Sequence, residues 1–559
     1  MKTRKRRTRK TEFLTDIYGT AIERTRKIQP VSFARQVEIL EEPWLEFRYL
    51  QRVMDPRDGL SLFGPVDFEE KFHPESISYG VVGTQNGIAL FKQFSTLLRL
   101  PHVHNTKVVY VERKPFLQKI EGPALDAQLK LWPPFPGFEA AFSCKLPEHP
   151  TRTSELDARQ LREAARHPNR FQRAYDVADL YLEGIKSLKR KEEKIDVAVC
   201  VVPEDVFRFC RMKSVLKLEE EEQQGFAQDH EDPNRIEYGY DQGLVEEQDT
   251  SASEYSPDFR RQIKARLMGS GIPFPIQILR ETTLRPGDEF EIGDRGLTPL
   301  SDRAWNISVA FYYKAGGKPW RLGTARQGVC YVGLVYKRTP EFQESRTACC
   351  AAQMFLDSGD GVVFRSQFGY WYSPDDEEMH LSPEAAKDLL TRVLATYDDQ
   401  EGKRPLKEVF LHYLAPITKV EYEAFKTACP KDVKVVGVVV RPDRYGVHLF
   451  REGTRPVIRG TFWKVNKAMG YLWASGFKPR LAAYDGSETP VPLRIVIEHG
   501  EADIKQVASD ILGLTKLNYN ECKYGDAQPV TISFSNLVGE ILVSNPKIRE
   551  PERFFRFYI

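Results

Sequence analysis

Apolar and polar positions along the chain predict strands and helices that take turns. The run IDVAVCVVP (195–203) is almost continuously apolar, which is typical of a parallel strand buried on both faces. Apolar residues at helical spacing run through 154–190 and predict two amphipathic helices. In the last third, strands such as GVCYVGLVYK alternate with helices such as SPEAAKDLLTRVLATYDD. The pattern predicts two α/β domains, each built on a largely parallel sheet that helices cover on both sides.

Length and charge add a second level of organisation. A chain of 559 residues is too long for one hydrophobic core, so we expect two or three domains. The formal net charge is only +2, but its distribution is uneven: residues 2–10 are strongly basic and residues 219–249 are strongly acidic. The basic arm, residues 1–30, is either a solubilising tail or a non-specific contact to nucleic acid. The acidic tract has too few apolar residues to form a core and interrupts the α/β pattern.

Cysteine usage and hydropathy indicate the compartment. No run of about 18 apolar residues is present, and no apolar core follows the N-terminal charges, which argues against a membrane span and a secretory signal. The eight cysteines form no CxxC pair, and several lie in apolar runs, where a thiol behaves as a small buried hydrophobe. We therefore expect a cytoplasmic protein without a membrane partner.

A group of basic residues suggests an anion pocket. In RRQIKARLM, Arg260 and Lys264 lie about one helical turn apart; Gln277 follows on a predicted strand, and Lys314 stands in the last turn of the next helix. Cations near the loop ends of a parallel sheet would bind an anionic group such as a phosphate. On spacing alone, a solvated basic helix face and a lysine at a helix C-terminus are the simpler explanation.

The tail of the chain resembles a known family. LTKLNYN, a gap and PVT, within residues 512–542, resemble the C-terminal part of PIWI domains in prokaryotic Argonaute proteins. Further stretches agree in order: EPWLEF, DPRDGLSLFGPVDF and YGVVGT resemble the lead-in of short Argonautes, which lack N and PAZ domains. RRQIKARLM, PIQIL and YYKAGGKPWRL are similar to the MID pocket, and YVGLVYKR and FLHYLAPITKVEYEAF to the first and second catalytic strands of PIWI. The resemblance covers residues from about 38 to 559, without the basic arm and the acidic insertion.

The resemblance implies a fold and its domain limits. It implies an α/β chain in which a MID domain with a Rossmann-like parallel sheet precedes a PIWI domain of RNase H-like fold. The basic arm would occupy residues 1–30. The lead-in segment and MID domain would occupy 31–320, with the acidic insertion at about 219–250, and the PIWI domain 321–559.

The resemblance also assigns roles to the basic group. Lys264 and Lys314 would supply positive charge to the 5′-phosphate of a guide strand. Gln277 would contact that phosphate and, with the terminal carboxylate of Ile559, hold Mg²⁺. Arg260 stands where the family often has an aromatic residue or histidine, and its guanidinium plane can also stack on a base.

A polar run near the tail is a second candidate contact. Thr515, Lys516, Asn518 and Asn520 are suited to the backbone of a guide strand. An exposed helix end rich in polar residues explains the same run without a ligand.

The positions of the nuclease carboxylates hold other residues. Cleavage of the RNase H type uses two divalent cations, which carboxylates must surround. The resemblance places the first aspartate at Val335, the second at about Tyr413 and the last acidic residue or histidine at Asn536. The glutamate-finger position stays unassigned: PDDEEM (374–379) has carboxylates whose alignment with it is open, and one carboxylate cannot replace the set. We expect no nuclease activity in this chain.

These expectations combine into one function with two alternatives. The chain would bind a 5′-phosphorylated guide RNA, pair it with complementary single-stranded DNA of plasmids or phages, and activate an APAZ-containing effector in prokaryotic immunity. That effector would be a TIR or sirtuin-like NADase or a nuclease, in a heterodimer that oligomerises on target binding. The first alternative is a guide-directed nuclease that cuts the target itself. The second is a nucleic-acid-binding scaffold without a guide.

Overall fold

The computed structural model describes most of the chain. The described residues are 14–15, 21–22, 37–104, 131–189, 193–214, 252, 255–268, 270–287, 298–338, 348–355, 361–365, 381–400, 405–453, 455–484, 486, 489–545, 552 and 554–559. Nearly all of the basic arm, the acidic insertion and the stretch PDDEEM lie outside the described residues.

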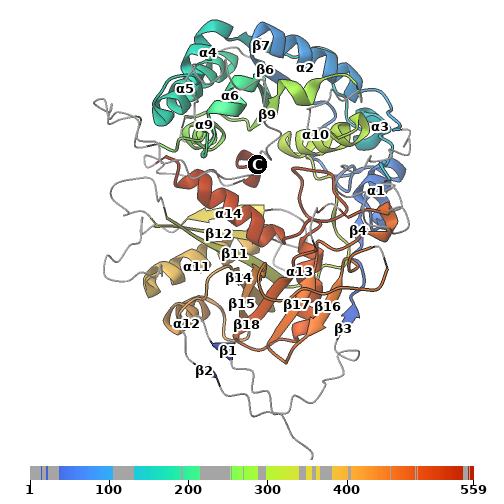
Figure 1. The fold of residues 1–559 in the computed structure, drawn as a ribbon, viewed down its shortest axis with the longest axis vertical. Helices are drawn as coiled ribbons and strands as arrows, with labels where there is room; N and C mark the ends of the chain where they lie inside the picture. Colours follow the sequence, from blue (N-terminus) through green and yellow to red (C-terminus); the bar gives the residue numbers. More distant parts are fainter. Residues whose placement is uncertain are drawn as a thin grey trace, which may run out of the picture.

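The N-terminal half is built around a four-stranded parallel sheet in the order β7-β6-β8-β9 (Figure 1). The expected strand in IDVAVCVVP is confirmed as β8 (Val197–Val202), and all six of its residues are buried. Three of the described helices of this half, α2, α4 and α9, begin at side-chain caps; at the start of α2 the side chain of Thr84 accepts a hydrogen bond from the N–H of Gly87. The other strands and helices of this half are β6 (Tyr79–Gly83), β7 (Arg152–Glu155), β9 (Ile276–Arg280), α2 (Gln85–Leu98), α3 (Phe138–Phe142), α4 (Ala158–Ala165), α5 (Arg170–Lys189), α6 (Glu204–Phe209), α9 (Phe259–Leu267), η4 (Glu281–Leu284) and α10 (Leu300–Lys314).

The C-terminal half is built around a nine-stranded sheet in the order β13-β12-β11-β14-β15-β18-β17-β16-β3. Only β11, β14 and β15 pair in parallel, so the expected largely parallel sheet is wrong here. The physical reason is that β12 and β13 return as hairpins on one side, and β16 to β18 do so on the other. The elements are β11 (Val329–Arg338), β12 (Ala348–Phe355), β13 (Gly361–Arg365), α11 (Pro383–Gln400), β14 (Glu408–Tyr413), α12 (Lys419–Ala428), β15 (Lys434–Pro442), β16 (Thr461–Lys464), β17 (Met469–Trp473), η5 (Pro479–Leu481), β18 (Leu493–His499), α13 (Ile504–Leu514) and α14 (Val530–Leu542).

The lead-in segment contacts the nine-stranded sheet as well as the parallel one. β3 (Val37–Ile39) pairs with β16 at the edge of the nine-stranded sheet, although the expected boundaries place it with the first domain. β4 (Leu45–Glu46) then forms a small sheet with β5 (Arg52–Val53) and β10 (Arg321–Leu322), ahead of α1 (Pro56–Leu62). The short pieces β1 (Leu14–Thr15) and β2 (Ala21–Ile22) pair only with each other.

The C-terminus lies between the two halves (Figure 1). The final turn η6 (Phe555–Phe557) follows a tail whose last residue, Ile559, is buried. Phe555 stacks on Phe534 of α14 with ring centroids 4.1 Å apart. The apolar ending of the sequence is therefore packed into the core, as expected.

No helix among the residues described above is long and apolar enough to cross a membrane. Cys144, Cys200 and Cys210 are buried, and burial raises the pKa of each thiol to about 12. They pack as small hydrophobes, as the sequence predicts.

The hairpin between β4 and β5 turns through two large residues in a left-handed conformation. Tyr49 and Leu50 have φ angles of 58° and 57°, and the N–H of Gln51 donates to the carbonyl of Arg48 at 3.3 Å. This geometry is that of a type I′ turn, in which asparagine and glycine are preferred because positive φ is costly for other residues.

We expect Tyr49→Asn with Leu50→Gly to raise the free energy of unfolding by about 1 kcal/mol, because the strain relieved exceeds the added chain entropy of glycine. Urea denaturation measures the change. Leu62→Asn, at a residue that is likewise more than half exposed, is the control and should not raise it. An unchanged or lower stability of the double variant would contradict the strain at this turn.

Candidate nucleic-acid interface

Three of the predicted pocket residues meet between α9, β9 and α10. Lys264 comes from α9, Gln277 from β9 and Lys314 from the last turn of α10, and all three are buried. The Nζ of Lys314 donates to Oε1 of Gln277. The Nζ of Lys264 donates to the backbone carbonyl of Tyr558 at 3.0 Å. The structure thus brings these side chains together and adds the C-terminal tail to the group.

The surroundings of Lys264 and Lys314 disfavour the charged form of both side chains. Burial lowers the pKa of both Lys264 and Lys314 well below the usual value, and the positive charge of Arg260 lowers both further. Arg260 itself is exposed. Within the part of the chain that the structure describes, neither lysine forms an ion pair with a carboxylate. Because buried lysines are normally paired, this arrangement suits an anion that brings its own negative charge.

The tail contributes a further cation that the sequence analysis did not select. A Cβ built on Gly316, whose φ is +106°, would lie 3.1 Å from Nη1 of Arg556. The Nε of Arg556 is buried and has no hydrogen-bond partner. Gly316 follows Lys314, the last residue of α10, by two positions. The guanidinium of Arg556 therefore lies close to the C-terminal end of α10. The signal for it is an arginine flanked by aromatic residues in the ending RFFRFYI.

The donor atoms for Mg²⁺ are few. The expected ligands are the amide oxygen of Gln277, which already accepts from Lys314, and the terminal carboxylate of Ile559. No group of three or more His, Cys, Asp or Glu residues that could hold a metal exists in the described ranges. Mg²⁺ often binds through one or two protein oxygens together with phosphate oxygens and water. The residues present therefore fit this cation only when a phosphate completes its coordination.

The first nuclease position lies on the face of the nine-stranded sheet that α14 covers. A Cβ on Gly539 of α14 would lie 3.2 Å from Cγ1 of Val335, which is buried in the core. Gly333 lets the helix approach closely, because a Cβ there would lie 1.9 Å from the carbonyl oxygen of Thr531. Val335 thus packs against a helix where a metal ligand would stand.

Tyr413, at the expected second position, lies on the opposite face of the sheet from Val335. Its side chain packs in the hydrophobic cluster on the other face of the sheet, with Leu334 and the helices α11 and α12. The residues of this strand that face α14 are its neighbours, because side chains alternate between faces. His412 contacts Oγ1 of Thr531 at 2.9 Å through Nδ1, and Leu414 packs against the α14-side core. Burial lowers the pKa of His412 to about 3, so its ring is neutral near pH 7.

The third position, Asn536, lies on α14 and donates to Oε1 of Glu540 at 3.4 Å. Glu540 is a carboxylate on the α14 side near Val335. It pairs with Arg261 at 2.9 Å and with Lys337 at 3.4 Å. Two cations thus neutralise this carboxylate, and the three expected positions supply no carboxylate of their own.

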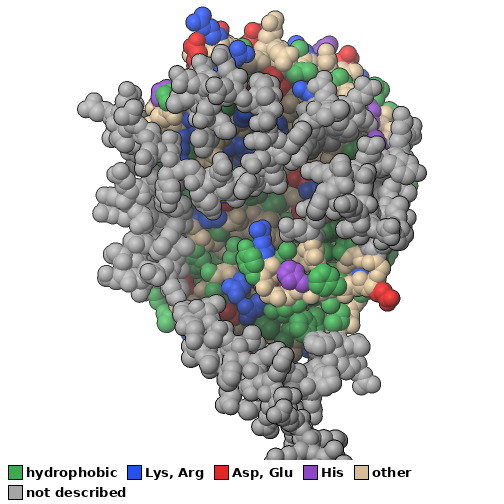
Figure 2. All heavy atoms as spheres, in the orientation of Figure 1, with side chains coloured by type: hydrophobic (Ala, Val, Ile, Leu, Met, Phe, Trp, Pro, Cys, Tyr) green, Lys and Arg blue, Asp and Glu red, His purple; other side chains and the backbone are tan. Residues whose placement is uncertain are grey.

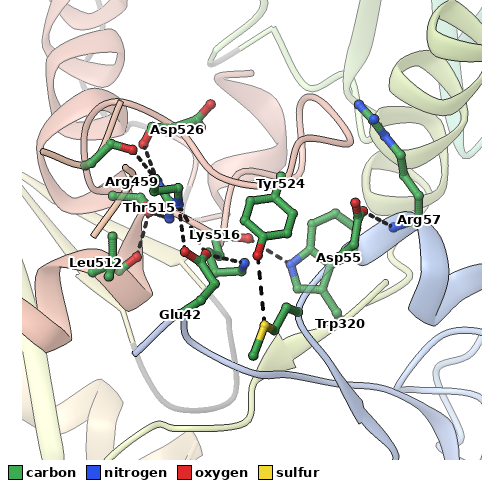
Figure 3. A network of polar contacts seen from close by, with 12 residues as sticks. Glu42, Asp55, Arg57, Trp320, Arg459, Leu512, Thr515, Lys516, Tyr524 and Asp526 are labelled. Atoms are coloured by element: carbon green, nitrogen blue, oxygen red, sulfur yellow. Dashed lines mark hydrogen bonds and ion pairs between the residues drawn. The ribbon is translucent and has the colours of Figure 1, made fainter. Parts of the chain in front are cut away.

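Thr515 and Lys516, two of the predicted guide-backbone contacts, make internal contacts in this structure. Lys516 is buried and its Nζ pairs with Oε1 of Glu42 at 2.6 Å. Oγ1 of Thr515 accepts from Nη2 of Arg459 at 2.6 Å and donates to the carbonyl of Leu512 (Figure 3). Arg459 also pairs with Glu42, at 3.1 Å. These side chains join the lead-in segment to the nine-stranded domain, and Arg459, Thr515 and Lys516 are buried.

The neighbouring asparagines are partly accessible. Asn518 and Asn520 are half-buried. The side chain of Asn518 donates to Asp526 at 2.7 Å and accepts from the backbone N–H of Asn520 at 2.9 Å. Their polar atoms shape the loop that follows α13, and Asn520 keeps its own amide free for other contacts in the residues that the structure describes.

The surface between the two halves is hollowed in the view of Figure 2, and Lys and Arg side chains are visible in and beside the hollow where the described atoms are in view.

Solved structures of known proteins have a fold similar to that of this chain. No protein-family model and no curated protein matches the sequence. The fold is similar to that of Clostridium butyricum Argonaute bound to a guide DNA and a 19-mer target DNA, with a TM-score of 0.54, 16% identity, and coverage of 92% of this chain and 54% of that one. It is also similar to Aa-Ago with externally bound siRNA, with a TM-score of 0.51, 14% identity, and coverage of 93% and 56%. A structure of A. aeolicus Argonaute matches with a TM-score of 0.48.

The two structures with the higher TM-scores agree with the resemblance found in the sequence. The parallel four-stranded domain corresponds to MID and the nine-stranded domain to PIWI. The chain therefore has the fold of Argonaute proteins and spans about half the length of the Argonaute chains that it matches.

Proposed function

We propose that this chain is a guide-loaded short Argonaute that recognises a target strand without cutting it. The observation that carries the proposal is the pair of buried lysines, Lys264 and Lys314, which have no carboxylate partner among the described residues and lie between α9, β9 and α10. A terminal phosphate carries the negative charge that these groups need and accepts several hydrogen bonds. Two of the matching Argonautes are described with a guide DNA and target or with siRNA, which supports a nucleic acid as the ligand.

The proposed guide is a 5′-phosphorylated RNA and the proposed target is complementary single-stranded DNA. Sequence would be read by base pairing, while the protein contacts phosphates and backbone, so that affinity falls with salt. When bound, Mg²⁺ would neutralise part of the phosphate charge, held by Gln277 and the terminal carboxylate of Ile559. Lys264, Lys314 and Arg556 would position the phosphate by charge and hydrogen bonding.

The absence of cutting is proposed from the residues at the expected catalytic positions. Val335 packs against α14, Tyr413 points to the other face of the sheet, and Asn536 contacts Glu540. Valine and tyrosine offer Mg²⁺ no carboxylate oxygen. Activity would then reside in an APAZ-containing partner, a TIR or sirtuin-like NADase or a nuclease, which target recognition activates in defence against plasmids or phages.

A cleavage assay separates this proposal from a guide-directed nuclease. The chain is loaded with a 5′-phosphorylated guide RNA and mixed with end-labelled complementary DNA in Mg²⁺ or Mn²⁺, and a gel-shift assay confirms that the DNA is bound. We expect the bound DNA to remain intact. Metal-dependent cleavage that Asp375→Asn with Asp376→Asn abolishes would overturn the proposal and favour the nuclease.

A second assay tests the effector. The chain is co-expressed with the product of the adjacent reading frame, and NAD⁺ is measured after guide and target are added. We expect NAD⁺ consumption or DNA degradation only when guide and complementary target are both present. Activity that is the same with a non-complementary strand would contradict a sensor role.

A further inference from the structure

A loop between β15 and β16, residues 443–453, exposes two aromatic side chains. Tyr445 is 96% exposed and Phe450 is 76% exposed. His448, which lies between them in the sequence, is exposed as well. Rings of this size normally bury most of their surface in a folded chain, because the burial of apolar area is favourable. A tyrosine and a phenylalanine that are both exposed on one loop therefore indicate a contact surface.

The other apolar residues of the loop hold it in place. Val447 and Leu449 are half-buried and pack against a small hydrophobic cluster. The buried members of this cluster are Val457, Tyr471 and Trp473. Burial and exposure alternate from Val447 to Phe450, so His448 and Phe450 lie on the side of the loop that faces away from the cluster. The exposed rings are thus presented by an anchored segment.

A turn fixes the start of the loop. The N–H of Gly446 donates to Oδ1 of Asp443 at 3.0 Å, and the N–H of Asp443 donates to the carbonyl of Pro492 at 2.9 Å, just before β18. The side chains of Tyr445 and Phe450 form no hydrogen bond or ring contact with another residue that the structure describes. Both rings are therefore available to a ligand.

Basic residues dominate the loop and its two ends. Residues 441–455 contain the arginines Arg441, Arg444, Arg451 and Arg455 and the acidic residues Asp443 and Glu452. Arg444 directly precedes Tyr445, Arg451 directly follows Phe450, and both arginines are exposed. In the described ranges, neither of these two arginines pairs with a carboxylate. A ring beside a guanidinium suits a nucleotide, because the ring can stack on the base while the guanidinium contacts a phosphate.

The loop begins at the edge of the sheet that carries the first nuclease position. β11, β14 and β15 run parallel, and Leu334, Tyr413 and Val439 are partners across them. Val335 is therefore level with the end of β15, two strands away, which corresponds to about 10 Å. A nucleic-acid strand that passes Val335 would meet the start of this loop.

We propose that residues 443–453 form a stacking platform for a single-stranded nucleic acid. Tyr445, His448 and Phe450 would stack on its bases, and Arg444 and Arg451 would contact its phosphates. The assignment of the strand as the unpaired part of a target rests on the proposed function, whereas the binding of a single strand does not.

The outward side chains favour a nucleic acid over a protein as the occupant. The aliphatic residues Val447 and Leu449 face the hydrophobic cluster, so the described residues of the loop offer a protein no continuous apolar patch. The outward side chains that remain are mainly aromatic or basic, and a polyanion with flat bases matches both kinds.

The test uses the full chain without a guide and a fluorescein-labelled oligodeoxythymidine of about ten nucleotides, within the usual size of a stacking site. Its 5′ end is a hydroxyl, so that the guide pocket contributes little. Fluorescence anisotropy at a fixed salt concentration measures the affinity. Tyr445→Ala with Phe450→Ala should weaken binding at least about tenfold, because two stacking contacts are lost. Tyr445→Phe with Phe450→Tyr should bind within about twofold of the unchanged chain, because both rings remain.

Matched controls separate stacking from other effects. An abasic oligomer with the same number of phosphates should bind at least about tenfold more weakly, since it has no bases to stack. Tyr49→Ala with Phe72→Ala, at an exposed tyrosine and an exposed phenylalanine of the lead-in segment, should alter the affinity for oligodeoxythymidine less than about twofold.

Charge reversal tests the phosphate contacts. Arg444→Glu with Arg451→Glu should weaken binding at least about tenfold and lower its dependence on salt. Lys419→Glu with Lys426→Glu, at exposed residues of α12, makes the same change in net charge and should alter binding less than about threefold. Equal losses in the two variants would contradict a role for the loop arginines.

Two results would overturn the platform itself: an unchanged affinity of Tyr445→Ala with Phe450→Ala, or equal binding of the abasic oligomer. If that variant keeps its affinity and instead loses its complex with the product of the adjacent reading frame, the loop belongs to a protein partner. The preference for a 5′-phosphorylated guide is measured on the same preparation. Its absence would contradict the guide pocket and leave the stacking platform standing.

Discussion

The variant Lys264→Met with Lys314→Met is expected to bind a 5′-phosphorylated guide RNA about 100-fold more weakly than the unchanged chain. Each lysine is buried and would donate a charge-assisted hydrogen bond to the phosphate, and the loss of one such bond costs about 1.5–3 kcal/mol. Two losses of about 1.5 kcal/mol correspond to about a hundredfold change in the dissociation constant. Filter binding or fluorescence anisotropy at a fixed salt concentration measures it.

The same variant should fold at least as stably as the unchanged chain when no guide is present. Burial lowers the pKa of both lysines, so their charged forms destabilise the unliganded fold, and methionine fills a similar volume without charge. Lys426→Met, on the surface of α12, is the control for a general loss of positive charge. Guide affinity that falls equally in the control would show that non-specific charge, rather than the pocket, sets the affinity.

Glu42→Gln is expected to lower the free energy of unfolding by about 3 kcal/mol, because the removal of one partner from a buried ion pair leaves the others uncompensated. Glu42 pairs with Lys516 at 2.6 Å and with Arg459 at 3.1 Å. Burial alone would raise the pKa of Glu42, but these two cations outweigh it and lower that pKa. Burial lowers the pKa of Lys516 to about 8 even with Glu42 beside it. Urea denaturation followed by tryptophan fluorescence measures the loss.

A second substitution tests whether the unpaired cation causes that loss. Glu42→Gln with Lys516→Met should recover a large part of the stability, because one of the two stranded charges is removed. Glu38→Gln is the surface control: its pair with Lys505 is half exposed, and we expect a change of at most about 1 kcal/mol. A Glu42→Gln variant as stable as the Glu38→Gln control would contradict the role of this network in joining the lead-in segment to the nine-stranded domain.

The strand β8 and the three pocket residues Lys264, Gln277 and Lys314 show what the sequence could predict. An uninterrupted apolar run indicates a strand buried on both faces, and β8 has all six residues buried. Lys264 of α9, Gln277 of β9 and Lys314 in the last turn of α10 meet in the fold, as the resemblance implies. The apolar pattern was sufficient for β8, whereas the pocket residues were selected through the resemblance, because spacing alone favoured a solvated basic helix face.

Tyr413 and Lys516 show where the sequence was insufficient. In a strand, a shift of one residue moves a side chain to the opposite face, so an alignment that is uncertain by one position cannot decide between Tyr413 and its neighbours. The burial of Lys516 depends on Glu42, which lies more than 470 positions earlier in the chain, and no local pattern reports such a contact. Arg556 was missed for the same reason, because it meets the end of α10 only in the folded chain.

The most direct test of the central claim compares two ends of one RNA. The affinity of the unchanged chain is measured for one guide-length RNA with a 5′-phosphate and for the same RNA with a 5′-hydroxyl. We predict that the phosphorylated RNA binds at least about tenfold more tightly, since one terminal phosphate would meet the buried lysines Lys264 and Lys314. Equal affinities for the two RNAs would contradict the assignment of this pocket to the 5′ end of a guide.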